Sequence, residues 1–241
     1  MTIPEIKYFE NTGRYKWTHG KKKNKFMSDI EVRDIFDQRL DKYKERVEQI
    51  SQQLFDKKIS IGAWSQRVGD LYKKAGTEAF MIGHPTELNA SDKGIMGAFV
   101  RTQNRRFKEF LTKIRAGDLS EAQIVDRAKK YISKANEMRE EGRRRHMQNV
   151  LYIWETRKLA VAEHCPSCLR YAARGWVPIG TLPRITEDCE CQSNDKCYFK
   201  YSRKRTRPTS RTSSIGIMTL EGYKMTDIIK TKQKSKVLCH N

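Results

Sequence analysis

Five of the six cysteines lie between positions 165 and 197, where they could bind a metal ion. A structural zinc ion takes four Cys or His ligands in a closed tetrahedron. Cys165 and Cys168 have the Cys-x2-Cys spacing that places two thiolates on one side of a metal, and Pro166 favours a tight turn between them. We therefore predict a structural Zn²⁺ site with Cys165 and Cys168 as two of its ligands.

The other two ligands must come from the second group of cysteines. Cys191 and Cys197 are the favoured pair, with Cys189 as the alternative ligand. His164 and Asp195 are reserve ligands. Two disulfides formed after release from the cell are the main alternative to a metal. A redox Cys-x-x-Cys is a weaker one, because no thioredoxin-like βαβ pattern surrounds the pair.

Motifs typical of enzymes do not stand out in this sequence. We find no paired carboxylates with a nearby histidine, no Gly-rich phosphate loop and no His-Glu-x-x-His pattern. A sequence with these properties predicts a protein that is not an enzyme and has no catalytic residue.

The chain is strongly basic, with 49 Lys and Arg against 29 Asp and Glu and a formal net charge of +20. Such a surplus favours a polyanionic partner, most simply nucleic acid. No apolar run reaches the roughly 20 residues of a transmembrane helix, and no signal-peptide core is present, so we expect no membrane partner and synthesis in a cytosol. The predicted nucleic-acid contacts fall in three clusters: Lys21, Lys22 and Lys23; Arg143, Arg144 and Arg145; and Arg203, Lys204 and Arg205.

The elements that would position these residues are mainly helical, and residues 28–146 are predicted to be an irregular bundle of long amphipathic helices. Apolar residues recur at helical spacing. Ser28 with Glu31 and Ser120 with Gln123 match the capping-box pattern, and Ser60 is a further N-cap. The sequence predicts a loop over 84–94, a third helix around 95–114 and a fourth running from 120 through 138.

Three further segments complete the predicted organisation. Residues 1–27 are an aromatic and basic arm that needs a partner to become ordered, or else a disordered tail. Residues 147–201 are a small Cys-rich α+β module like a zinc knuckle. Its chain begins helical, forms a strand before Cys165, is irregular over 175–183 and ends in a strand at 198–201. Residues 202–241 are a basic, flexible tail by composition.

The order of these features resembles the phage head morphogenesis proteins of the Mu F type, which are minor head proteins. The matching pieces are an Arg- and Tyr-containing helix, a Cys-x2-Cys preceded by Glu-His, a Gly- and Pro-rich segment, and a final cysteine before a short strand. In this chain they are residues 126–131, 163–168, 175–183 and 191–201. Asp195 stands where the family pattern has a cysteine, which keeps Cys189 as the alternative ligand.

The resemblance implies a virion structural or assembly protein, made in the host cytoplasm and located in the capsid interior or at the portal vertex. Its implied partners are the portal protein, the major capsid protein, or both, together with packaged double-stranded DNA bound without sequence preference. The main alternative is a zinc-ribbon nucleic-acid-binding protein, which would require basic residues concentrated on the knuckle.

Overall fold

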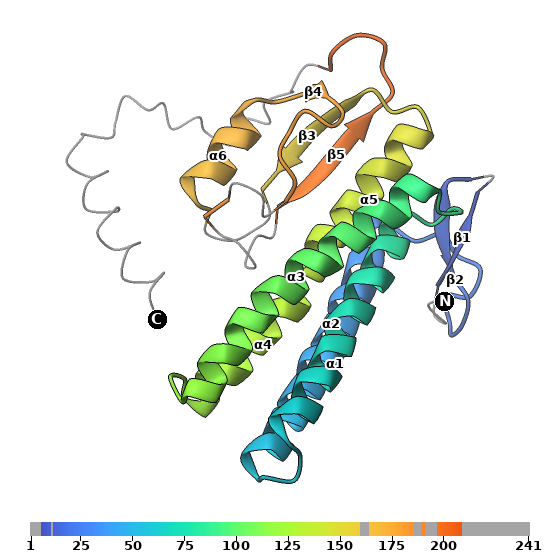
Figure 1. Cartoon of the computed structure of the whole chain (residues 1–241). Helices are drawn as coiled ribbons and strands as arrows, with labels where there is room; N and C mark the ends of the chain where they lie inside the picture. The colour runs from blue at the N-terminus through green and yellow to red at the C-terminus, as the bar shows by residue number, and fades with distance from the viewer. Residues whose placement is uncertain (1–5, 11, 160–163, 186–188, 191–196, 209–241) are drawn as a thin grey trace. The chain divides into compact units, whose positions relative to one another are not determined.

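The computed structural model describes residues 6–10, 12–159, 164–185, 189–190 and 197–208 (Figure 1). All of them lie within one compact unit, Met1–Pro208. The predicted tail beyond residue 208 lies outside the described residues. The described chain is mainly helical and carries a small strand module, as the sequence predicts.

Five helices make up the bundle, and their N-termini follow the capping signals in the sequence. Ser28 and Ser120 form complete capping boxes with Glu31 and Gln123, and the Ser60 side chain accepts a hydrogen bond from Ala63 N. The helices are α1 (Asp29–Phe55), α2 (Ile61–Gly83), α3 (Ala90–Ala116), α4 (Glu121–Ser133) and α5 (Ala135–Asn149).

The third helix begins earlier than predicted. Asn89 caps it, and its side chain and that of Asp92 form a reciprocal capping box across the first turn. Asp92 is fully buried. The sequence Ser-Asp-Lys-Gly over 91–94, which resembles a turn, is therefore the start of α3.

Aromatic side chains fill the centre of the bundle. Trp64, Phe107 and Phe110 pack with ring centroids about 6 Å apart, and Tyr131 packs against Phe107 and Phe110. The buried indole N–H of Trp64 donates to Ser51 Oγ at 3.0 Å. The amphipathic stripes of the sequence therefore serve the core.

The predicted fourth helix is two helices that meet at Lys134. The backbone of Lys134 has φ −62° and ψ −14°, and α5 continues beyond it to Asn149 (Figure 1). Neither a proline nor a glycine lies at this interruption, so the sequence offers no signal for it. Helix α5 packs closely against α2, where Gly83 and Gly142 bring the two backbones together.

The N-terminal segment is a β-hairpin, not an arm without contacts of its own. Strand β1 (Ile6–Phe9) pairs antiparallel with β2 (Arg14–Trp17), and Ile6 packs with Met27 and Ile35. The Tyr15 hydroxyl donates to the Ile82 carbonyl at 2.6 Å. The prediction of a partner-dependent arm is corrected for the described part of residues 1–27, because these contacts fasten it to α1 and α2.

The Cys-rich module contains a three-stranded antiparallel sheet in the order β4-β3-β5. Its elements are β3 (Trp154–Lys158), α6 (Pro166–Ala173), β4 (Val177–Pro178) and β5 (Tyr198–Ser202). Thr156 in the middle of β3 pairs with Lys200 of β5. The predicted strands before the first cysteine and after the last are confirmed.

Candidate metal centre

The first cysteine pair lies at the start of helix α6. Cys165 is the N-cap residue, with an extended backbone, and Pro166 occupies the first helical turn. Proline suits this place because its fixed φ fits the helix and its missing N–H would have no partner there. Cys168 follows one turn later and is fully buried. The Cys-x2-Cys pair is therefore held by a helix start, and not by an isolated turn.

Cys189 brings a third sulfur to this pair from a different part of the chain. Its Sγ lies 3.4 Å from Cys165 Sγ and 3.1 Å from Cys168 Sγ. Together the three side chains form a group whose ligand atoms lie within 4.8 Å of one another. Cys189 was predicted as the alternative ligand, and the structure places it beside both residues of the first pair.

Cys197 and His164 form a second group around the same central thiol. Cys197 Sγ lies 3.7 Å from His164 Nδ1, and both lie within 4.8 Å of the Cys168 ligand atom. Cys168 is thus common to both groups. Cys191 and Asp195 lie outside the described residues.

The donor set fits a soft or borderline metal ion. Thiolates and imidazole are the ligands found in structural zinc sites, where a Zn–S bond of about 2.3 Å implies sulfurs about 3.8 Å apart at the corners of a tetrahedron. The sulfurs of Cys189 and its two neighbours are slightly closer than that, which a small outward movement around an ion would correct. These groups can therefore hold a metal ion.

A small apolar cluster surrounds the cysteines. Cys168, Cys189 and Cys197 are buried with side chains from α6, β5 and the intervening loop: Tyr171, Leu182, Ile185 and Phe199. The irregular segment after α6 contributes Leu182, as the Gly- and Pro-rich sequence predicts for a non-helical stretch. The surroundings exclude water from most of the donor atoms.

Buried charges fasten this module to α5. Glu155, fully buried on β3, lies 3.0 Å from Arg144 Nε and accepts a hydrogen bond from Leu182 N at 3.0 Å. Burial raises the pKa of Glu155, while the Arg144 guanidinium opposes that shift. Arg157 on the same strand donates to the carbonyls of Pro183 and Arg184. The loop that carries Leu182 is therefore tied to both β3 and α5.

The run Arg143 to Arg145 requires a correction, because its side chains make internal contacts. Arg144 is 6% exposed and is paired with Glu155, so the prediction that it contacts nucleic acid is wrong. Arg145 lies 2.7 Å from Asp92, and Arg143 lies 2.6 Å from Asp29. All three cations are neutralised by carboxylates of the fold, which leaves them poorly suited to hold phosphate.

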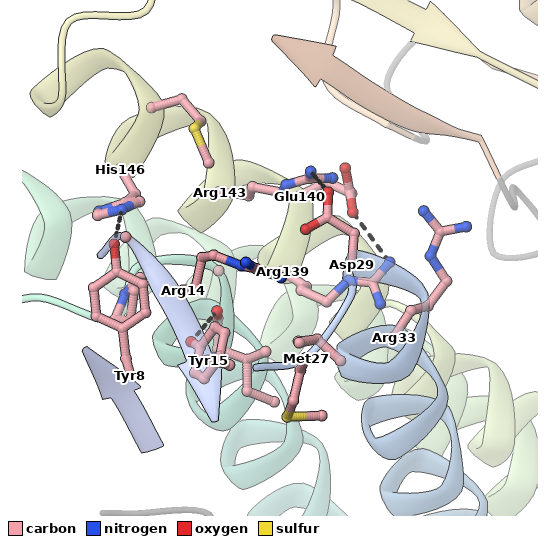
Figure 2. A pocket seen from close by; sticks show the side chains of 16 residues that line it. Tyr8, Arg14, Tyr15, Met27, Asp29, Arg33, Arg139, Glu140, Arg143 and His146 are labelled. Atoms are coloured by element: carbon pink, nitrogen blue, oxygen red, sulfur yellow. Dashed lines mark hydrogen bonds and ion pairs between the residues drawn. The ribbon is translucent and has the colours of Figure 1, made fainter. Parts of the chain in front are cut away.

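Figure 2 shows where Arg143 lies, in a pocket of mixed polar and apolar lining between the N-terminal hairpin and helices α1, α2 and α5. The Tyr8 hydroxyl lies 2.8 Å from His146 Nε2 across it. Burial, together with neighbouring His84, lowers the pKa of His146 to about 4. The cavity therefore has a neutral histidine at pH 7, and the Tyr8–His146 contact joins the hairpin to α5.

The remaining predicted nucleic-acid contacts lie on the surface. Lys21, Lys22 and Lys23 occupy the exposed turn after β2, where Lys22 pairs with Glu31 at 2.8 Å. Arg203, Lys204 and Arg205 follow β5 and are exposed, with the Arg203 guanidinium stacked on the Tyr152 ring at 4.5 Å. Arg203 lies close enough to His146 to contribute to its lowered pKa, so this cluster lies near the end of the arginine run.

Comparison with family models, curated proteins and solved structures finds no match to this chain. Among the described residues, no helix is both long and apolar enough to cross a membrane.

Proposed function

We propose that this chain is a non-enzymatic structural protein of a phage head, positioned in the capsid interior or at the portal vertex near packaged DNA, with zinc as the metal of its cysteine centre. The observation that supports this proposal is the convergence of the segments that carry the family resemblance. The Cys-x2-Cys on α6 and Cys197 before β5 meet around Cys168.

A structural role for the centre is favoured by its closure. A catalytic zinc keeps one coordination position open to water and substrate, whereas a structural zinc is enclosed by four protein ligands. Here Cys168 is fully buried, and Cys189 and Cys197 are 7% and 4% exposed. Two groups of three donor side chains share Cys168, so protein ligands are at hand on both sides of this thiol.

Metal content tests the centre itself. We expect about one equivalent of Zn²⁺ per chain in protein purified without chelator, and a chelator should lower the unfolding temperature because metal binding is coupled to folding. Cys168→Ser should lose the metal. Cys239→Ser, which removes the one cysteine outside the cluster, is the matched control and should keep it. Less than about half an equivalent of zinc in the wild type would contradict the metal proposal.

Particle composition tests the biological role. We expect the chain in DNA-filled heads by mass spectrometry, and crosslinking should join it to the portal protein or the major capsid protein. Absence from purified particles would refute the minor-head proposal whatever the metal result. If the protein instead selected one DNA sequence from a random pool, the zinc-ribbon nucleic-acid-binding alternative would replace it.

A further inference from the structure

Helix α3 is unusually basic compared with the other long helix, α1. Between Ala90 and Ala116 it carries seven basic side chains and two acidic ones, whereas α1 carries five basic and seven acidic. The positive charge is therefore not shared equally between these two helices.

Four of these cations share one face of α3, which we call the α3 stripe: Arg101, Arg105, Lys108 and Arg115. At 100° per residue, their spacing of four, three and seven keeps them within an arc of about 80° and along about 21 Å of helix. The opposite face carries the buried Gln103, Phe107, Phe110 and Leu111. The stripe consequently points away from the core.

The four cations of the α3 stripe are not paired with carboxylates among the described residues. All four side chains belong to exposed residues, and within the described part of the chain none has a carboxylate oxygen within 4.0 Å. This contrasts with Arg143, Arg144 and Arg145, each paired with a carboxylate. An ordinary solvated helix face mixes both signs, as α1 does, so an acid-free row of four cations favours a polyanionic partner.

We propose that the α3 stripe binds the phosphate backbone of duplex DNA. The helix holds the four cations in a row, and about 21 Å of duplex presents roughly 12 phosphate charges. The four side chains are long and flexible, and contacts to phosphate carry no sequence information, so we expect binding that is insensitive to base sequence. The inference deepens the DNA contact of the proposed function and moves it from the arginine run to α3, but binding in solution does not require the phage assignment.

The test compares two full-length variants with equal loss of charge. The first replaces the stripe by R101Q, R105Q, K108Q and R115Q. The second replaces four exposed cations on α1 and α2 by K42Q, R46Q, R67Q and K74Q. Both sets lie on the surface, and circular dichroism with metal content checks that both variants fold as the wild type does.

Affinity for a 30-base-pair duplex of mixed sequence is measured between about 50 and 200 mM salt. Each phosphate contact contributes about 0.9 to the slope of log K against log salt, so loss of the stripe should lower that slope by up to about 3.6 and weaken binding at least tenfold. The control variant should change the slope by less than about 1.

An unchanged slope in the stripe variant, or equal losses in both variants, would overturn the proposal. Tighter, equally stripe-dependent binding of a single strand of the same length would overturn the assignment to duplex. These outcomes are independent of the particle test. If the protein is found in heads but its DNA affinity does not depend on the stripe, only the inference about α3 is refuted.

Discussion

Replacing Gly142, where α5 crosses α2, should destabilise the protein by an amount that follows from the structure. A Cβ built on Gly142 would lie 2.4 Å from the Phe80 carbonyl oxygen and 3.2 Å from His84 N, where ordinary contact begins near 3.4 Å. Gly142→Ala therefore requires the helices to separate by about 1 Å. Overpacking costs about 1–3 kcal/mol, and a clash with a backbone oxygen places this case at about 2–3 kcal/mol, of which the better helix propensity of alanine returns about 1 kcal/mol. We expect a net loss of about 1–2 kcal/mol.

Gly94→Ala on α3 is the matched control, because nothing lies within 4 Å of its added Cβ. It should stabilise the protein by about 0.5–1 kcal/mol through helix propensity alone. Urea unfolding at constant pH measures both changes. At about 2–4 °C per kcal/mol, thermal unfolding should shift downward for Gly142→Ala and upward for Gly94→Ala. A Gly142→Ala protein as stable as the wild type would refute the close crossing of α2 and α5.

Three further predictions concern the polar contacts. Arg144→Met should cost about 3–5 kcal/mol in urea unfolding because it leaves Glu155 buried without its cation, and adding Glu155→Gln should recover part of the loss; additive losses would contradict the pair. The lowered pKa of His146 means that the folded protein binds fewer protons than the unfolded chain, so its contribution is complete above about pH 6.5 and is lost as the pH falls towards 4. His146→Gln should therefore reduce the loss of stability between pH 7 and 5.5 by about 1.2 kcal/mol, measured by urea unfolding at both values. An unchanged loss would argue against a buried neutral His146. Tyr15→Phe should lower stability by about 1 kcal/mol and speed amide exchange in the hairpin, because it removes the hydrogen bond to the Ile82 carbonyl; unaltered exchange would contradict that contact.

Local signals in the sequence predicted the helix starts and the strands of the Cys-rich module. Ser28, Ser60 and Ser120 cap their helices because a side-chain oxygen satisfies a backbone N–H within three residues, which is a property of the local sequence alone. The strand after Cys197 was predictable for the same kind of reason, since its three aromatic residues favour a half-buried strand.

Long-range pairing is what the sequence could not reveal. Asp29 and Asp92 are more than 50 residues from the arginine run in sequence, and Glu155 lies on the strand that follows α5, so each pair depends on how the elements fold back on one another. A run of arginines looks the same whether it faces solvent or buried carboxylates. The N-terminal hairpin was missed for a related reason, because its short strands are stabilised by contacts with α1 and α2 and not by their own length.

The strand that follows the last described cysteine connects the metal centre with α5. Phe199 N donates to Glu140 Oε2 at 3.2 Å, and the Phe199 carbonyl accepts from Arg143 at 3.2 Å. Phe199 lies two positions after Cys197. A metal bound to Cys197 would therefore hold β5 in place, and the β5 backbone is hydrogen-bonded to Glu140 and Arg143 on α5. Loss of the metal would therefore free polar groups on α5 as well as the thiols. The arginine run serves this junction, and its cations are engaged within the fold.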